Sequence, residues 1–165
     1  MISKIDPKHL EGNVFSMIGD QWALLTAGSP EHFNTMTVSW GGLGVLWGKN
    51  VATVYVRPQR YTREFMEQYD RFTLSFYGPE WKKALALCGS KSGRDVDKVK
   101  ECGFTPANEN GAPYFEEADL VLCCKKLYWQ DMDPTHFLSE EIEKNYPDKD
   151  YHRIYIGEIE AALKR

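Results

Sequence analysis

The sequence predicts a mainly β protein, and its pattern suits an antiparallel β-barrel better than a parallel α/β sheet. Most apolar segments are short and alternate apolar with polar residues, as strands do when one face is buried. The segments with helical spacing are few and short, and they do not alternate regularly with the strands as βαβ units require. With 165 residues, the chain is long enough for one domain with its own core and too short for two comfortable ones.

The clearest predicted strand spans Val51–Arg57, with Ala52, Val54 and Val56 on one face. Several glycines between residues 41 and 48 precede it and predict bulges or a close approach to the backbone. The other predicted strands are Val14–Ile18, Trp22–Thr26, Thr35–Trp40, Phe72–Phe76, Asp119–Trp129, a fragment at His136–Leu138, and Tyr151–Ala161.

Short helices are expected between these strands. Thr62 is placed to cap a helix over Arg63–Tyr69, a second helix covers Glu80–Leu87, and a third covers Asp95–Cys102 and ends at Gly103. Residues Thr105–Pro113 are expected to form a loop. Residues 1–12 are polar and predict an N-terminal arm, which leaves residues 13–165 as the single domain.

The net charge of the chain argues against two classes of binding partner. A formal net charge of −4 disfavours a nucleic-acid groove or a polybasic membrane surface, because both need a positive field. The aromatic fraction of 13% is high, and flat rings suit flat ligands. Filling a barrel core or a dimer interface is nevertheless the commoner use of such rings.

Cysteine and histidine spacing predicts neither disulfides nor a metal site. The four cysteines make no Cys-x-x-Cys pair, and the scattered histidines His9, His32 and His136 make no metal-ligand spacing. The chain opens without an apolar leader, and no apolar segment approaches the roughly 18 residues that a membrane span needs. We therefore expect a soluble cytoplasmic protein with reduced thiols, bound neither to a membrane nor to nucleic acid.

An anion site is one of two interpretations of the segment that ends the clearest strand. Arg57 and Arg60 flank the start of the predicted helix, and together with the Thr62 hydroxyl they can hold a phosphate. The alternative is that both arginines pair with carboxylates such as Glu64, and spacing alone leaves the two equally favoured.

The segment Asn34–Thr37 also has two interpretations. Its amide, its hydroxyls and the backbone at the start of a strand can hydrogen-bond a planar heterocycle, but a turn with a threonine-rich strand start is the commoner explanation. Neither Gly-x-Gly-x-x-Gly nor a Walker pattern occurs, so the common nucleotide-binding folds are not supported.

Four motifs in order resemble one family. They are Asn-Thr-Met-Thr-Val-Ser-Trp-Gly from Asn34, Arg-Pro-x-Arg-Tyr-Thr from Arg57, Gly-Ser-x-Ser-Gly-Arg-Asp-x-Asp-Lys from Gly89, and His-Arg-Ile-Tyr-Ile-Gly-Glu-Ile from His152. Together they resemble the flavin reductase-like, FMN-binding split-barrel family, and within it the flavoredoxin branch. The resemblance runs from about Trp22 to Ile159.

The resemblance implies a split antiparallel β-barrel with a few short peripheral helices, which forms a homodimer with one FMN per subunit near the interface. It implies that the isoalloxazine ring lies against the first motif and the phosphate against the second and third. The implied cofactor-binding residues are Asn34, Thr35, Met36, Thr37, Ser39, Trp40, Arg57, Arg60, Tyr61, Thr62, Ser90, Lys91, Ser92 and Arg94.

One departure from the family concerns the segment Gly44–Asn50, where many flavin reductases carry Ser-x-x-Pro-Pro and this chain has no proline. This leaves open whether FMN is an exchanged substrate or a bound prosthetic group. His152 is the one candidate catalytic residue that the resemblance implies, since a histidine at a similar place lies on the nicotinamide side. A lone histidine at a strand start is more often only solvated or hydrogen-bonded.

The expected function is an FMN-binding oxidoreductase. It would take electrons from NADH, NADPH or a redox protein and pass them to a flavin, a protein or a metal centre. The alternative is a non-catalytic FMN-binding electron-transfer protein or flavin carrier. An oligonucleotide- or peptide-binding β-barrel without flavin is a third possibility, and the negative charge argues against its nucleic-acid version.

Overall fold

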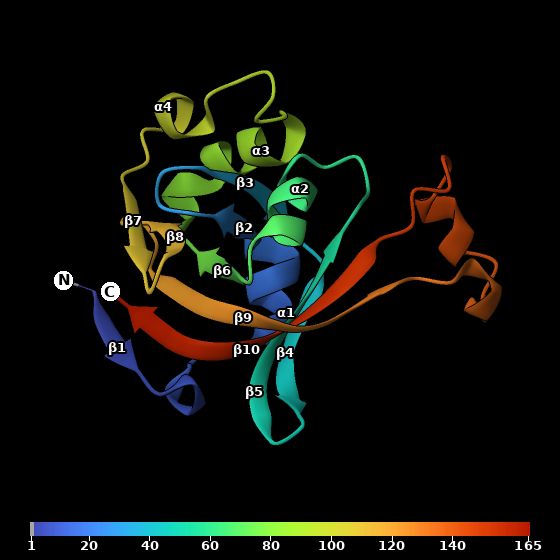
Figure 1. The fold of residues 1–165 in the computed structure, drawn as a ribbon, viewed down its shortest axis with the longest axis horizontal. Coiled ribbons are helices and arrows are strands. Elements are labelled where there is room, and N and C mark those ends of the chain that lie inside the picture. The colour runs from blue at the N-terminus through green and yellow to red at the C-terminus, as the bar shows by residue number, and fades with distance from the viewer. Residues whose placement is uncertain (1) are drawn as a thin grey trace.

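One curved antiparallel sheet forms the framework of the protein (Figure 1). The computed structural model describes residues 2–165, and its main sheet has the order β3-β2-β6-β9-β10-β5-β4, with β1 added to β10. Strands β7 and β8 make a separate hairpin. The strands are β1 Ser3–Ile5, β2 Ala23–Gly28, β3 Phe33–Val38, β4 Gly41–Leu46, β5 Lys49–Val56, β6 Arg71–Phe76, β7 Pro106–Glu109, β8 Ala112–Phe115, β9 Leu120–Asp131 and β10 Arg153–Lys164.

The sheet curves into an open barrel because its two edge strands follow each other in the chain. Only Ser39 and Trp40 separate β3 from β4, so the ends of the two edges must lie close together without pairing. All pairs along the path are antiparallel. The prediction of a mainly β, antiparallel split barrel is therefore confirmed.

Short helices cover the sheet, as Figure 1 shows. Helix α2 packs on β2 and β3, and α3 packs on β3. The helices are α1 Val14–Ser16, α2 Thr62–Gln68, α3 Lys82–Ser90 and α4 Lys98–Cys102, with a π-helical turn at Met17–Gln21 and 3-10 turns at Pro7–His9, Pro79–Trp81, Pro134–His136 and Ile142–Asn145. No helix within residues 2–165 is both long and apolar enough to traverse a bilayer.

The core lies on both faces of the central strands. Inside the curve, Leu25, Phe72 and Tyr155 belong to one buried cluster. On the other face, neighbours such as Leu24 pack with the aromatic side chains under α3 and the β7–β8 hairpin. Because both faces are covered, all six residues of β2 are buried.

Local side-chain chemistry overturns two of the strand predictions. Residues 14–18 are helical because Asn13 Oδ1 accepts hydrogen bonds from the amides of Phe15 (2.9 Å) and Ser16 (3.3 Å), which caps a helical turn. The fragment predicted at His136–Leu138 is also wrong. Asp133 caps a 3-10 turn there instead.

Two predictions, about a loop and a cap, also fail. The predicted loop Thr105–Pro113 is the β7–β8 hairpin, whose turn residues Asn110 and Gly111 both have positive φ, as a type I′ turn requires. Thr62 lies inside α2 and does not cap it. The segment predicted as an N-terminal arm contains β1, in which Ser3–Ile5 pairs with the end of β10.

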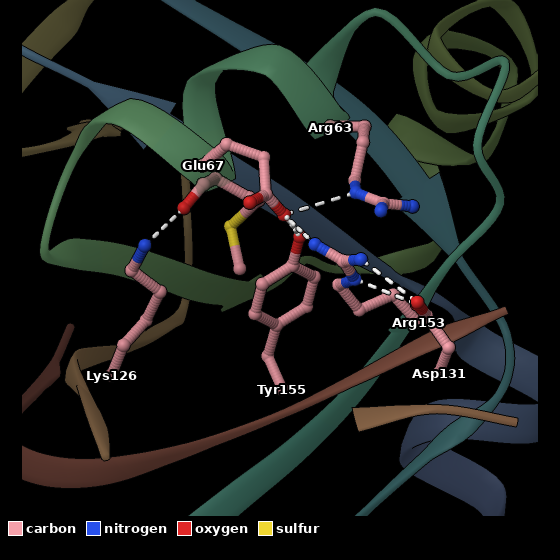
Figure 2. Close-up of polar contacts among 7 residues, drawn as sticks. Arg63, Glu67, Lys126, Asp131, Arg153 and Tyr155 are labelled. Atoms are coloured by element: carbon pink, nitrogen blue, oxygen red, sulfur yellow. Dashed lines mark hydrogen bonds and ion pairs between the residues drawn. The ribbon is translucent and has the colours of Figure 1, made fainter. Parts of the chain in front are cut away.

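An ion-pair network attaches α2 to the C-terminal end of β9 and the N-terminal end of β10 (Figure 2). Glu67, on α2, accepts hydrogen bonds from Arg63 (3.0 Å), Arg153 (2.9 Å) and the Tyr155 hydroxyl. Arg153 also donates two hydrogen bonds to Asp131 on β9, at 2.7 and 2.8 Å. Burial alone would raise the pKa of Glu67, but these hydrogen bonds outweigh it and lower that pKa. The network sets the position of α2 relative to the first residue of β10.

A close contact inside the barrel predicts the effect of one substitution. A methyl group added at Gly157 would lie 2.7 Å from the buried Phe72 ring and 3.0 Å from Cys124 Cβ. We expect Gly157→Ala to lower the free energy of unfolding in urea by about 1–3 kcal/mol, the usual cost of overpacking. Gly44→Ala is the matched control, since nothing lies within 4 Å of its added methyl group. Equal stability of the two variants would contradict this packing.

Candidate functional site

Three adjoining cavities lie between β3, the start of α2 and the loop that follows α3. The first, of about 210 Å³, is lined by Met36, Thr37, Val38, Ser39, Trp40, Tyr55, Arg57, Arg60 and His152. The second, of about 140 Å³, is lined by Asn34, Met36, Gln59, Arg60, Tyr61, Thr62, Ser90, Lys91, Ser92, Gly93 and Lys98. The third, of about 430 Å³, shares Asn34, Tyr61, Gly93 and Lys98 with the second and includes Thr35 and Arg94. Every residue proposed from the sequence thus lines one of the three.

The threonine hydroxyls of β3 are already engaged. Thr35 Oγ1 bonds to Thr26 Oγ1 at 2.8 Å inside the sheet, and Thr37 Oγ1 donates to the carbonyl of Leu85. Because β3 is an edge strand, the backbone groups on its free side have no strand partner. What this strand offers a ligand is therefore mainly its backbone.

Arg60 is the principal cation between the first two cavities. Its Nη1 donates to the Gly89 carbonyl at 2.8 Å, while its buried Nη2 has no hydrogen-bond partner within residues 2–165. Burial, followed by the nearby charge of Arg57, lowers the pKa of Arg60. A buried N–H without a partner is unfavourable by about 1–3 kcal/mol, so this arginine is suited to an anion.

Arg57 also lines the first cavity, but other residues already hold its guanidinium. Its Nη1 pairs with Asp150 and its Nη2 donates to the Asn145 carbonyl, both at 2.9 Å, and its guanidinium lies 4.8 Å from the centre of the Tyr146 ring. Arg57 thus attaches the segment 132–152 to the end of β5. Glu64, the carboxylate considered as an alternative partner of both arginines, pairs with Arg94 instead, at 2.8 Å.

The loop after α3 is held directly against β3 and α2. A methyl group at Gly93 would lie 2.0 Å from Asn34 Oδ1, so only glycine allows this approach. Asn34 in turn donates to Thr62 Oγ1 at 2.8 Å, which ties β3 to α2.

The polar side chains of this loop differ in their availability. The hydroxyl of Ser90 donates to the carbonyl of Ala86 at 2.9 Å, and that of Ser92 accepts from the Arg94 amide at 3.2 Å. The Arg94 guanidinium stacks on Tyr61, 4.5 Å from the ring centre, and faces the third cavity. Lys91 makes no side-chain hydrogen bond within residues 2–165.

Lys98 is a site residue that sequence analysis missed. It ends the third sequence motif without being among the predicted site residues, yet its side chain is buried and its Nζ donates to the carbonyls of Thr35 (2.7 Å) and Cys88 (2.8 Å). Burial lowers the pKa of Lys98 to about 8. Asp97 caps α4 through the Lys100 amide. A positive charge in the first turn of a helix is unfavourable because the helix dipole is positive there. This unusual position of Lys98 was the signal in the sequence that could have identified it as a site residue.

His152 is buried beside the first cavity. Its Nδ1 is 2.7 Å from the Tyr146 hydroxyl, and its ring centre lies 5.4 Å from that of Trp40 and 6.3 Å from that of Tyr55. Burial, reinforced by the charge of Arg57, lowers the pKa of His152 to about 4. The ring is therefore neutral at neutral pH. Sequence analysis did not select Tyr55 or Tyr146 for this site, because nothing local marks either of them.

The thiols show no activated cysteine. Cys88 and Cys102 lie with their Sγ atoms 3.8 Å apart, and burial raises the pKa of Cys88 to about 12. Cys123 and Cys124 are buried in the sheet. Among residues 2–165, no three His, Cys, Asp or Glu side chains come together as a metal site would require.

Comparisons with known proteins agree with this architecture. The FMN-binding domain of a flavin reductases-like enzyme from Shewanella baltica OS155 superposes with a TM-score of 0.71 at 20% identity, covering 99% of this chain and 77% of that one. Flavoredoxin from Methanosarcina acetivorans gives a TM-score of 0.69 at 24% identity, covering 98% and 76%. The styrene monooxygenase flavin reductase from Pseudomonas putida S12 gives 0.63 at 18% identity, covering 86% and 77%.

These likenesses establish the fold, and a match along the sequence establishes the family. The family described as "Flavin reductase like domain" matches residues 15–164, nearly the whole chain. The resemblance inferred from the four motifs is thereby confirmed, and the chain belongs to the flavin reductase-like domain family.

Proposed function

We propose that this protein binds FMN in the first and second cavities and works as an oxidoreductase through it. The observation that carries the proposal is Arg60, whose buried Nη2 has no hydrogen-bond partner among residues 2–165 and which lines both cavities. A phosphate oxygen at this position would satisfy that N–H with a charge-assisted hydrogen bond. The FMN-binding protein of Thermus thermophilus, with a TM-score of 0.70, and the Shewanella domain support the choice of FMN.

The second cavity suits the phosphate end. It brings Arg60, Lys98 and Lys91 together with the Thr62 and Ser92 hydroxyls. Lys98 Nζ uses two N–H groups on carbonyls and has a third to offer. Arg57 contributes less to the phosphate than the sequence suggested, because Asp150 and Asn145 already hold its guanidinium.

The first cavity suits the isoalloxazine ring. The free backbone of β3 over residues 36–39 forms one wall, and Trp40, Tyr55 and His152 form another. Backbone N–H groups at such an edge stabilise a ring that gains negative charge on reduction. When bound, FMN supplies the hydride and electron chemistry, and the chain supplies binding, orientation and a water-poor wall.

In this proposal the protein works in the cytoplasm. Electrons would pass from NADH, NADPH or a redox protein to the bound FMN, and from FMN to a flavin, a protein or a metal centre. Neutral His152 would then act as a hydrogen-bonding group on the donor side and not as a general acid, because an imidazole with a pKa of about 4 is not protonated at neutral pH. The second candidate is an FMN-binding electron-transfer protein or flavin carrier without nicotinamide activity. The likeness to the Methanosarcina flavoredoxin favours it.

A homodimer is part of the proposal. Several large apolar side chains are exposed on the β4–β5 hairpin, the link before it and the outer part of β9: Trp40, Val45, Trp47, Leu127, Tyr128 and Trp129. The rings of Trp47 and Tyr128 lie edge to face with their centres 6.2 Å apart, and this contact connects the hairpin to β9. Exposed aromatic side chains gathered in this way suit a self-complementary twofold interface.

The purified protein is expected to be yellow, or to become so on adding FMN, and its spectrum tests the cofactor. Anaerobic stopped-flow mixing of the loaded protein with NADH and NADPH then tests the function. Rapid bleaching indicates a reductase, whereas reduction by a protein donor alone indicates the carrier. A protein that stays colourless with added FMN refutes both.

The phosphate contact is tested by Arg60→Ala. Losing one charge-assisted hydrogen bond should cost on the order of 1.5–3 kcal/mol, which weakens FMN binding by about 10- to 150-fold in fluorescence titration. Riboflavin has no phosphate, so its weaker binding should hardly change. Arg71→Ala is the control, since Arg71 pairs with Glu160 away from the cavities. Unchanged FMN affinity in Arg60→Ala would show that the phosphate lies elsewhere.

The oligomeric state is tested by sedimentation velocity. We expect the wild type to sediment as a dimer and Trp47→Glu to sediment as a monomer, because a charge on this aromatic surface would be buried unpaired. Leu138→Glu changes an equally apolar and 98% exposed side chain on the segment 132–152 and should leave the dimer intact. A monomeric wild type at micromolar concentration would rule out the interface.

A further inference from the structure

The segment between β9 and β10 places a side chain that the sequence motifs do not include against His152, which lines the first cavity. Residues 132–152 project beyond the sheet, at the right of Figure 1, and return to it at His152. Arg57 holds the segment at Asp150 and at the Asn145 carbonyl, as described above, and Gln59 Nε2 also donates to Asp150, at 2.6 Å. This anchoring places Tyr146 against His152.

The hydrogen bond between these two residues determines which nitrogen of the histidine carries a proton. Tyr146 OH lies 2.7 Å from His152 Nδ1 and 3.4 Å from the sulfur of Met132. An imidazole nitrogen is a much stronger acceptor than a thioether, so the hydroxyl donates to Nδ1. In a neutral ring the proton then resides on Nε2, which makes no hydrogen bond within residues 2–165.

Burial is the main cause that keeps both groups neutral. The groups that face His152 are Arg57, Asp150, Tyr55 and Tyr146. Burial and Arg57 together outweigh Asp150 and lower the pKa of the imidazole. Burial raises the pKa of Tyr146, so its hydroxyl keeps the proton that it donates.

We propose that Tyr146 is a positioning residue that fixes His152 as a neutral Nε2–H donor toward the first cavity. The ligand group that such a donor recognises is a neutral carbonyl or amide oxygen. His152 then orients a reactant through a hydrogen bond and does not protonate it. The identity of the ligand rests on the proposed function, whereas the state of the histidine does not.

The state of the histidine is tested by nitrogen-15 NMR of the imidazole in the protein without added flavin. Wild-type His152 should show the Nε2–H tautomer and remain neutral from pH 8 down to about 5. Tyr146→Phe should mix the two tautomers and raise the pH of protonation toward the ordinary value of about 6.5. Tyr151→Phe is the control, because that hydroxyl bonds to Glu143 at 3.0 Å while its ring packs on Tyr146.

Two results would overturn the assignment. One is an Nδ1–H tautomer in the wild type, which would mean that the Tyr146 hydroxyl donates to Met132 instead. The other is an unchanged tautomer and an unchanged protonation pH in Tyr146→Phe. Thermal unfolding shows whether each variant is folded, and a folded Tyr146→Phe with altered histidine signals excludes a merely structural role.

The ligand is tested by titrating nicotinamide, a neutral carboxamide, into the FMN-loaded protein. The Nε2–H proton of His152 should shift downfield in the wild type, and the shift should be reduced in Tyr146→Phe and retained in Tyr151→Phe. No shift in a protein that has bound FMN would refute the carbonyl ligand while leaving FMN binding intact. Failure to bind FMN would refute the proposed function and leave the tautomer assignment standing.

Discussion

The side of the first cavity that carries Arg60 and His152 depends on the hydrogen bonds that Glu67 accepts. Its carboxylate holds Arg63 within α2 and Arg153 and Tyr155 on β10. The chain that leads into α2 carries Arg60, and the residue before Arg153 is His152. One carboxylate therefore sets the distance between the cation proposed for the phosphate and the histidine beside the ring cavity. Removing this carboxylate would take one hydrogen-bond acceptor from each of Arg63 and Arg153, which are both partly buried. Such a loss lowers the stability of the protein, because partly desolvated charges need partners.

Lys98 performs the corresponding task on the opposite wall. Burying an ammonium group is unfavourable unless its N–H groups find acceptors, and here the carbonyls of Thr35 and Cys88 provide two. These carbonyls belong to β3 and to α3, so the same bonds fix the loop after α3 against the edge strand. The loop glycine Gly93 completes the contact by approaching Asn34 too closely for any side chain.

The polar groups of the site divide into those that hold the protein together and those left for a ligand. The hydroxyls of Thr35, Thr37 and Ser90 are engaged within the protein. The backbone at the free side of β3 and one edge of the Arg60 guanidinium are not. The groups left for a ligand suit a flat heterocycle with an anionic tail, and in the proposed function that tail is the phosphate of FMN.

The sequence by itself determined the class of fold and the family, and it predicted Arg60 as a cation for a phosphate. Period-two alternation marks strands such as β5 because one face is buried, and motif order identifies the family without knowledge of contacts. It misplaced residues 14–18 and overlooked the β7–β8 hairpin, although the Asn13 cap and the Asn110-Gly111 turn are local signals that a closer reading could use.

Only the tertiary structure decided the roles of Arg57, Lys98 and Tyr146. Arg57 and Arg60 have similar surroundings in the sequence, yet Arg57 bonds to Asn145 and Asp150, which lie far along the chain. Arg60 keeps one buried nitrogen without a partner in the part of the chain that the structure describes. Lys98 is buried because α4 packs near β3, and Tyr146 reaches His152 because the segment 132–152 turns back. A side chain's role follows from the partners that compete for its hydrogen bonds, and folding brings those partners from distant parts of the chain.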